Sequence, residues 1–431
     1  MLKQWKASDS EAIEAWIRSR KTTADPTIMA MTAQILADVR EHQDEALYRY
    51  CETLDHVILS DLRVSEVALN SAYEKCDPQF IADLEEAKEN ILFFHQAQVR
   101  QGYELTKAND VYLGQRILPL ERIGVYVPGG RSAYPSSVLM NVLPAKIANV
   151  KEIIMVTPPS KTGEMDPYIA AAAKIAGVDQ IYTVGGAQAI AALAYGTQTI
   201  PRVDKIIGPG NIYVATAKKL VYGVVDIDMI AGPSEILVIA DEGANPVYVA
   251  ADLLSQAEHD PMASAILLTT SQAIADAVAQ EVEKQLKHLP KKAIAEASLS
   301  QYGAIIVLDT IEQCLQISDR IAPEHLELMI KDAKSYLDQV HHAGSIFLGY
   351  MTCESIGDYF GGTNHVLPTG GSARFYSALN VDNFVKKSSY LHWSEAALRQ
   401  DGNKIIRIAE AERLKAHANA VRVRLQRDEN V

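Results

Sequence analysis

The stretch ILVIADEGANPVYVAADLLSQAEHDPMASAILLTT, residues 236–270, decides the fold class. Two short runs of mostly branched apolar residues, at 236–240 and 265–270, flank a segment with helical spacing. Asn245 is suited to cap that helix, and Pro246 is suited to its first turn. A strand, a helix and a second strand in this order form a crossover unit, which predicts parallel strands.

The same pattern continues along most of the chain. Residues 121–235 and 236–350 each hold a series of short apolar runs, most of them followed by a turn and a helical pattern. Residues 1–120 and the segment after residue 370 are mostly helical in pattern. We therefore predict an α/β fold with two Rossmann-like units, mainly parallel sheets, and helical N-terminal and C-terminal segments. The expected strands are IGVYV (123–127), EIIMVT (152–157), QIYTV (180–184), KIIG (205–208), ILVIA (236–240), AILLTT (265–270), AIIVL (304–308) and SIFLG (345–349).

Composition narrows the choice of function. The 431 residues carry 41 Lys and Arg against 54 Asp and Glu, a net charge of −13. Phosphate backbones and acidic lipids repel an acidic protein, so neither a nucleic acid nor a membrane is an expected partner. No stretch reaches the roughly 20 apolar residues that span a bilayer, and the N-terminus has no signal-peptide pattern. The four cysteines are scattered, which disfavours a thiolate zinc site or a disulfide framework and predicts a cytoplasmic protein.

Three of the expected strands end in glycine-rich turns, at 125–137, 182–190 and 206–219. Glycine lets the backbone approach a ligand, and the free N–H groups of a following helix attract phosphate. None of these turns is a GxGxxG or P-loop motif, so each one alone is better explained as a plain strand–helix turn. Three such turns at the carboxyl ends of parallel strands nevertheless indicate a nucleotide site without the usual motif.

Two polar pairs suggest chemistry, and each has a plainer alternative. Gln256 and His259 lie three residues apart near the end of the helix expected over 245–260, so they share a face. They fit a metal or substrate site, or else a half-buried boundary pair. Glu324 and His325 lie between apolar residues. This pair fits general acid–base catalysis, and the alternative is a surface Glu beside a hydrogen-bonded His.

The glycine-rich loop 354–371 and the turn before residue 236 carry further candidates. In the loop, Asp358 is a candidate oxygen ligand and His365 a candidate substrate contact, with solvated loop side chains as the alternative. Ser234 fits a substrate hydrogen-bond donor or a turn residue. It does not fit a nucleophile, because no GxSxG elbow surrounds it.

A charged helix is predicted over residues 405–426, and it carries Glu412 and His417. These two residues are five positions apart, about 140° around an ideal helix, so they do not share a face. The plain interpretation is a charged surface helix. It would not hold if this segment docks over another site.

Nine ordered motifs, from about residue 122 to residue 421, resemble the histidinol dehydrogenase family. The resemblance implies an NAD-dependent enzyme that oxidises L-histidinol to L-histidine through L-histidinaldehyde. It implies reduction of two NAD and one zinc ion per subunit. The motifs are VYVPGGRSAYPSSVLMNVLPA, VGGAQAIAALAYGT, KIIGPGN, AGPSEILVIAD, DLLSQAEHD, APEHLEL, AGSIFLG, GDYFGGTNHVLPT and AERLKAHANAV.

The resemblance also implies roles for individual residues. His325 would accept protons, and Glu324 would activate the water that hydrates the aldehyde. The implied zinc ligands are Gln256, His259, Asp358 and His417. The implied substrate contacts are Ser234, Gln256, His259, His325, Asp358, His365, Glu412 and His417. The implied NAD contacts, one on each glycine-rich turn, are Tyr126, Gln188 and Asn211.

Members of that family are homodimers in which the C-terminal segment reaches the partner's active site. This implies that Glu412 and His417 serve the other subunit. The implied domains are an N-terminal helical segment (1–22), an α/β domain with the zinc and catalytic residues (23–121 and 236–370), an α/β NAD-binding domain (122–235) and a C-terminal helical segment (371–431).

Two departures from the family pattern carry limited weight. Met155 stands where many relatives have a cysteine, so a catalytic thiol is excluded there, and Asn149 stands where glycine is common in a turn.

Two other functions stay open: an NAD-linked dehydrogenase acting on a different amino alcohol, and a non-catalytic zinc- or nucleotide-binding protein. The intact Glu324 and His325 pair argues against the second.

Overall fold

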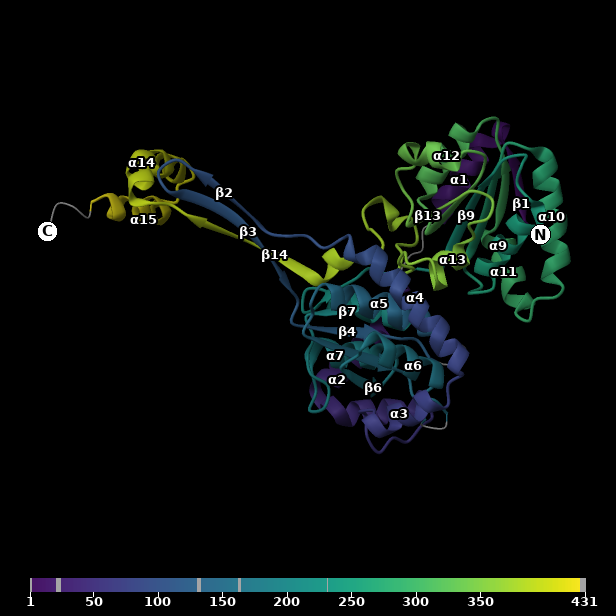
Figure 1. The fold of residues 1–431 in the computed structure, drawn as a ribbon, viewed down its shortest axis with the longest axis horizontal. Coiled ribbons are helices and arrows are strands. Elements are labelled where there is room, and N and C mark those ends of the chain that lie inside the picture. Colours follow the sequence, from purple (N-terminus) through teal and green to yellow (C-terminus); the bar gives the residue numbers. More distant parts are fainter. Residues whose placement is uncertain (1, 21–24, 130–132, 162–163, 231, 427–431) are drawn as a thin grey trace. The chain divides into compact units, whose positions relative to one another are not determined.

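The computed structural model describes residues 2–20, 25–129, 133–161, 164–230 and 232–426. The chain divides into unit 1, Met1–Gln98 with Leu120–Phe384, and the smaller unit 2, Val99–Pro119 with Val385–Val431. Unit 1 holds two parallel sheets, and unit 2 holds one antiparallel sheet (Figure 1). The predicted α/β class with mainly parallel sheets is thereby confirmed. Among the helices of the described ranges, none is long and apolar enough to cross a membrane.

The larger sheet of unit 1 has six parallel strands in the order β1–β11–β10–β9–β12–β13. Successive residues of β9 point to opposite faces, so Ile236 joins the core with α9, α10 and α11 while Leu237 joins the core with α1 and α12. The strands are β1 (Lys3–Lys6), β9 (Glu235–Ala240), β10 (Ser264–Thr269), β11 (Ala304–Val307), β12 (His325–Met329) and β13 (Ser345–Leu348). The helices are α1 (Ser10–Ser19), α9 (Pro246–Ala257), α10 (Gln272–Leu286), α11 (Lys292–Tyr302) and α12 (Ile311–Ile321).

Helix α9 begins where the sequence predicts. The Asn245 side chain accepts a hydrogen bond from the Val247 N–H, and Pro246 occupies the first turn. The helix ends at Ala257, so Gln256 lies in its last turn. These boundaries set the direction in which the last turn presents its polar side chains.

The second sheet of unit 1 has five parallel strands in the order β6–β5–β4–β7–β8. Leu36, Val39 and Leu47 of helix α2 join its core with α7 and α8, although the sequence analysis grouped this segment with 236–370. The strands are β4 (Arg122–Tyr126), β5 (Glu152–Thr157), β6 (Gln180–Thr183), β7 (Lys205–Ile207) and β8 (Asp226–Ile227). The helices are α2 (Pro26–Thr53), α3 (Glu66–Glu74), α4 (Pro78–Gln96), α5 (Pro135–Ile147), α6 (Pro167–Ala176), α7 (Gly186–Tyr195) and α8 (Ile212–Val221).

Short elements complete unit 1. Asn149 adopts a left-handed conformation with φ 62° after α5, in line with the turn role predicted for it. Helix α13 (Glu354–Tyr359) lies in the glycine-rich loop. The described 3₁₀ helices are η1 (Ala7–Asp9), η2 (Ala333–Gln339), η3 (Ser372–Arg374) and η4 (Val381–Phe384).

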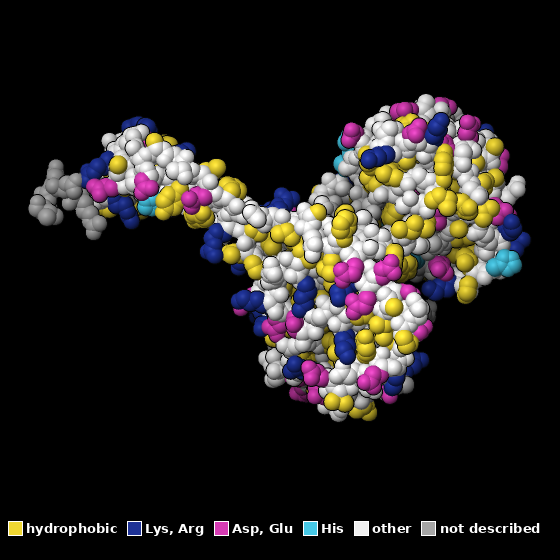
Figure 2. Space-filling view, in the orientation of Figure 1, with side chains coloured by type: hydrophobic (Ala, Val, Ile, Leu, Met, Phe, Trp, Pro, Cys, Tyr) yellow, Lys and Arg dark blue, Asp and Glu magenta, His cyan; other side chains and the backbone are white. Residues whose placement is uncertain are grey.

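Unit 2 has an antiparallel sheet in the order β14–β3–β2 and two helices. Its hydrophobic cluster is small, with Ile406, Ala409 and Ala418 buried. Apolar side chains stay exposed on the unit, and they include Tyr103, Leu105, Leu391, Ile408, Leu414 and Val423. Figure 2 shows hydrophobic side chains on the visible face of the molecule. The elements are β2 (Tyr103–Lys107), β3 (Val111–Pro119), β14 (Val385–His392), α14 (Glu395–Ala411) and α15 (Lys415–Leu425).

The single helix predicted over 405–426 is wrong, because the structure has two helices there. Arg413 has a φ of 62°, a left-handed conformation that cannot continue a right-handed helix. Helix α14 therefore ends at Ala411 and α15 begins at Lys415. The angle of about 140° between Glu412 and His417 assumed one regular helix and does not apply.

All eight predicted strands are present, and the structure adds others. Strand β12 was not predicted, because His325 and Glu327 interrupt its apolar character. Strands β1 and β14 are short of apolar residues, and the sequence analysis included both in helical segments. Both strands are held by backbone hydrogen bonds to a neighbouring strand, and not by an apolar face that the sequence would reveal.

Candidate active site

Residues from both sheets of unit 1 line one cavity of about 330 Å³. The carboxyl end of β7 and the loops after it form part of the wall, as expected for parallel sheets. The lining brings together eight residues that the sequence analysis singled out: Asn211, Ser234, Gln256, His259, Glu324, His325, Asp358 and His365.

Glu324 lies in the connection between α12 and β12. Ala322 ends α12 in a left-handed conformation with φ 54°, and Pro323 follows it. Glu324 Oε2 accepts a hydrogen bond of 2.8 Å from the backbone N–H of Glu235. Burial raises the pKa of Glu324 to about 8. A carboxyl group with such a pKa is suited to exchange protons near neutral pH.

His325 is the first residue of β12, and its ring orientation is fixed. Nδ1 lies 3.1 Å from the carbonyl oxygen of Glu235, which can only accept, so Nδ1 carries a hydrogen and donates it. Nε2 is therefore the nitrogen that gains or loses the second proton of the ring, and it lies 3.4 Å from Asp358 Oδ1. Burial lowers the pKa of His325, but the carboxylates of Glu324 and Asp358 outweigh burial and raise it to about 10. A ring with that pKa holds a proton at neutral pH, so His325 has to release it before it can accept one from a substrate.

A second histidine is oriented in the same way. The Nδ1–H of His365 donates to the carbonyl oxygen of Asp358 over 2.8 Å, and the Ser137 hydroxyl lies 3.2 Å from its Nε2. Burial lowers the pKa of His365, which favours the neutral ring. The neighbouring Asn364 donates to the Met140 carbonyl over 2.7 Å and anchors the loop to α5. The loop thus presents Asp358 and His365 from a fixed backbone.

Gln256 and His259, from the end of α9, both line the cavity. Gln256 is 1% exposed, and its Nε2 donates to Glu354 Oε2 over 2.6 Å. Its Oε1 is buried without a hydrogen-bond partner. Desolvation by the surrounding protein lowers the pKa of His259, which favours the neutral imidazole that binds metals.

The donors on the wall fit a metal ion in part. An unpaired amide oxygen, a neutral imidazole and a carboxylate are a nitrogen and oxygen set of the kind that zinc accepts. Within the part of the chain that the structure describes, however, no group of three or more His, Cys, Asp or Glu side chains is arranged to hold a metal.

The turn between β7 and α8 forms another part of the wall. Gly208 has a φ of 106°, and a Cβ there would lie 2.1 Å from the Tyr126 carbonyl oxygen, so only glycine fits. A buried ion pair of Lys218 and Asp228 holds this turn: the Lys218 ammonium donates to the Gly208 carbonyl, and Asp228 accepts from the Gly208 N–H. Asn211 caps α8 by accepting from the N–H groups of residues 213 and 214.

Replacing Lys218 with methionine is expected to lower the free energy of unfolding by about 3–5 kcal/mol, because it leaves a buried Asp228 without its counter-charge. Urea unfolding followed by circular dichroism measures the change. Lys219→Met is the matched control, since Lys219 is exposed on the same helix; it should stay within about 0.5 kcal/mol. A loss below about 1 kcal/mol for Lys218→Met would contradict the role given to the pair.

The other two proposed NAD contacts do not line this cavity. Tyr126 is 3% exposed, and its hydroxyl accepts a hydrogen bond from the Gly186 N–H. Gln188 is 2% exposed, and its Oε1 has no hydrogen-bond partner. Both lie at the glycine-rich turns of the five-stranded sheet, as predicted. Residues 130–132 of the first turn and residue 231 before Ser234 lie outside the described residues.

Glu412 and His417 belong to unit 2, where both are exposed. The cavity of unit 1 is thus described without them.

Sequence reasoning also missed functional neighbours. Glu235 holds Glu324 and His325 through its backbone, and Glu354 holds Gln256. For Glu235 the available signal was an acidic residue at the start of a buried apolar run; Glu354 has no such signal in its sequence surroundings.

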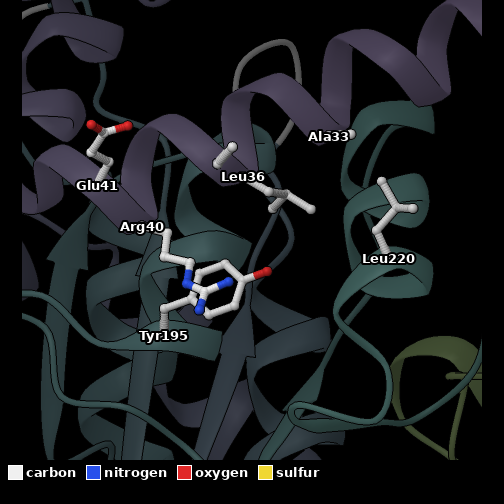
Figure 3. Close-up of a pocket in the computed structure, with 7 residues that line it drawn as sticks. Ala33, Leu36, Arg40, Glu41, Tyr195 and Leu220 are labelled. Carbon is white, nitrogen blue, oxygen red and sulfur yellow. The ribbon is translucent and has the colours of Figure 1, made fainter.

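A larger hollow of about 500 Å³ lies between α2, α7 and α8. The Arg40 guanidinium lies 5.6 Å from the centre of the Tyr195 ring on its wall (Figure 3). None of the residues singled out from the sequence lines it, and its lining holds no histidine. Its one carboxyl group, Glu41, is exposed and has no histidine beside it on the wall, unlike Glu324 in the first cavity.

Comparison with known proteins shows which family has this sequence and fold. The sequence model of the histidinol dehydrogenase family matches residues 18–425. A histidinol dehydrogenase of Streptococcus mutans is 58% identical over 397 residues, which are 92% of each chain. One of Bacillus anthracis is 54% identical over 413 residues, 96% of each chain. A crystal structure of histidinol dehydrogenase from Elizabethkingia anophelis superposes with a TM-score of 0.92 at 40% identity, covering 99% of this chain and 98% of that one.

Proposed function

The chain belongs to the histidinol dehydrogenase family, and from this we propose that it oxidises L-histidinol to L-histidine through L-histidinaldehyde, using zinc and two NAD. One observation carries the proposal. Glu324 and His325 are buried side by side on a cavity wall that also presents Gln256, His259 and Asp358. Acid–base groups and metal-binding donors thus face the same space.

In the first oxidation, His325 accepts the proton of the substrate hydroxyl. Its Nδ1–H is committed to the Glu235 carbonyl, so Nε2 is the atom that receives the proton. Removing that proton lets the alcohol carbon release a hydride. NAD, when bound, accepts one hydride in each of the two steps.

The second oxidation requires water. Only the hydrate of the aldehyde has a removable O–H on the carbon that gives up the second hydride. Glu324 takes a proton from the attacking water, for which its raised pKa of about 8 is suited. His325, after releasing the first proton to solvent, then accepts a proton from the hydrate as the second hydride leaves. Enclosing the aldehyde between these groups limits its escape.

Zinc fits the donor set, because the buried Oε1 of Gln256 has no hydrogen-bond partner and Gln256 lines the same cavity as His259 and Asp358. We propose these three as ligands, with His417 of a second copy of the chain as the fourth. A bound zinc ion would supply a Lewis-acid centre that fixes nitrogen atoms of the substrate. Ser234 and His365, also on the wall, would contact the substrate directly, with Glu412 from the second copy.

A homodimer accounts for two features of unit 2. The side chains of β2 are exposed along the whole strand, and Leu105, Leu391 and Ile408 are 58%, 69% and 64% exposed. Burial of such apolar surface favours association. Exposed Glu412 and His417 would thereby become available to another subunit. For NAD we propose Tyr126, Gln188 and Asn211, and the four free cysteines agree with a cytoplasmic location.

The test is the yield of NADH from a known amount of L-histidinol. We expect about two NADH per histidinol, and loss of the activity after a strong chelator with recovery on adding zinc. A yield of one NADH, or turnover of another amino alcohol in preference, would favour a different dehydrogenase. Zinc binding without any turnover would favour a binding protein.

A further inference from the structure

Three elements around the cavity each present two polar residues on one face. Helix α9 carries Asp252 and Gln256 four residues apart, and α13 carries Glu354 and Asp358 at the same spacing. Strand β12 carries His325 and Glu327 two residues apart. One member of each pair, Gln256, His325 or Asp358, lines the cavity. The other members, Asp252, Glu327 and Glu354, form a buried group called here the carboxyl layer.

The carboxyl layer links the three elements through hydrogen bonds. Glu327 is fully buried, and its Oε1 accepts the backbone N–H of Glu354 over 2.8 Å, which ties the start of α13 to β12. The carboxyl group of Asp252 on α9 is buried beside that of Glu327, and the two can share a hydrogen bond only when one of them is protonated. Glu354 is 3% exposed and receives Nε2 of Gln256 at its Oε2. The layer thus fixes the elements from behind the cavity wall.

The bond between Glu354 and Gln256 decides which end of the amide faces away from the layer. An amide has a donating nitrogen and an accepting oxygen on opposite sides of one carbon. With Nε2 bound to Glu354, Oε1 is turned away and is left without a partner. A buried acceptor without a partner is costly unless a cation or donor meets it.

We propose that Glu354 is a positioning residue that holds the Gln256 amide so that its oxygen, not its nitrogen, is offered to the metal. This rests on the proposed role of Gln256 as a ligand. The role requires only an acceptor at Glu354 Oε2. The hydroxyl of Ser255 contacts the other carboxylate oxygen of Glu354, Oε1. It also lies 2.7 Å from the backbone carbonyl oxygen of Asp252. The proton between them can sit on Ser255 Oγ or on Glu354 Oε1. In both cases Glu354 Oε2 can still accept the hydrogen bond from Gln256 Nε2.

Two substitutions separate hydrogen bonding from packing and charge. Glu354→Met keeps the volume but removes the acceptor, so the amide can rotate. Glu354→Gln keeps an acceptor oxygen for Gln256, and its NH₂ group can donate to Ser255 Oγ. Asp252→Asn is the matched control, because it alters a carboxyl of the same layer that lies beside Glu327.

The measurement is the zinc affinity of the metal-free protein, by competition with a chromophoric chelator. We expect Glu354→Met to bind zinc about 10–100-fold more weakly, with Glu354→Gln and Asp252→Asn within about threefold of the unaltered protein. A folded Glu354→Met protein with unchanged affinity would overturn the proposal, and so would a Glu354→Gln protein as weak as Glu354→Met.

Two further measurements keep the outcomes separate. If the unaltered protein binds no zinc, or if Gln256→Ala leaves the affinity unchanged, the proposed metal site itself has failed. If Glu354→Met does not fold, a crystal structure of the unaltered protein with zinc decides. Gln256 Oε1 on the zinc with Nε2 still on Glu354 supports the role, and Nε2 turned away from Glu354 overturns it.

Discussion

Replacing His325 with alanine is expected to lower kcat for histidinol oxidation by about 10²–10⁴-fold, the range for loss of a general base. The physical reason is specific to the ring. Its Nδ1–H is held by the Glu235 carbonyl, and Nε2 is the nitrogen left to accept a proton on the cavity wall. Steady-state NADH formation at saturating histidinol and NAD measures the change.

The control for this substitution is His288→Ala, because His288 is exposed and is not on the cavity wall. Its kcat should match that of the unaltered protein. Zinc content of His325→Ala should also be nearly unchanged, since His325 is not a proposed ligand. Its unfolding temperature should fall, because the substitution leaves a cavity at a buried side chain, so kcat is measured well below that temperature. A folded, zinc-loaded His325→Ala protein that keeps more than about a tenth of the original kcat would rule out His325 as the base.

Mixing two inactive proteins, His325→Ala and His417→Ala, is expected to restore activity. If each site combines His325 of one chain with His417 of the other, a mixed dimer has one site with both residues intact. Random pairing of equal amounts makes half of the dimers mixed, so about a quarter of the original activity should return. The two proteins are unfolded and refolded together, and NADH formation is measured per mole of protein.

Each protein refolded alone provides the baseline, and equal mixing of His325→Ala with Glu324→Ala is the matched control. Those two residues lie in one wall of one chain, so their mixture should stay at the baseline. No activity above either parent in the His325→Ala and His417→Ala mixture would show that the sites are not shared. That result would leave the catalytic roles of Glu324 and His325 intact.

Much of the fold was predictable because burial on both faces makes strands continuously apolar. Strands β9 and β10 were predicted on this basis, with α9 between them. Strand β12 was not predicted, because Glu327 interrupts its run of apolar residues. Glu327 is nevertheless buried, since it accepts a hydrogen bond from the Glu354 N–H. Strand β14 was missed for the opposite reason: it is exposed, and its partner is the backbone of β3.

The cavity residues were predictable where two polar side chains lie close together in the sequence. Glu324 beside His325, and Gln256 three residues before His259, are visible as pairs in the sequence. The residues that hold them are not visible, because their partners lie far along the chain. Glu235 contacts Glu324 across 89 positions, and Glu354 contacts Gln256 across 98. Such contacts follow from sheet order, which periodicity alone does not fix.

Strand β12 lies between β9 and β13, and its hydrogen-bond ladders run along both sides. The proposed base, His325, is therefore carried by an interior strand of a sheet and not by a loop that can open by itself. Its position is set by the cooperative stability of the whole domain. A destabilising substitution far from the cavity would thus reduce the number of working molecules in a cell before it altered the turnover of those that remain folded.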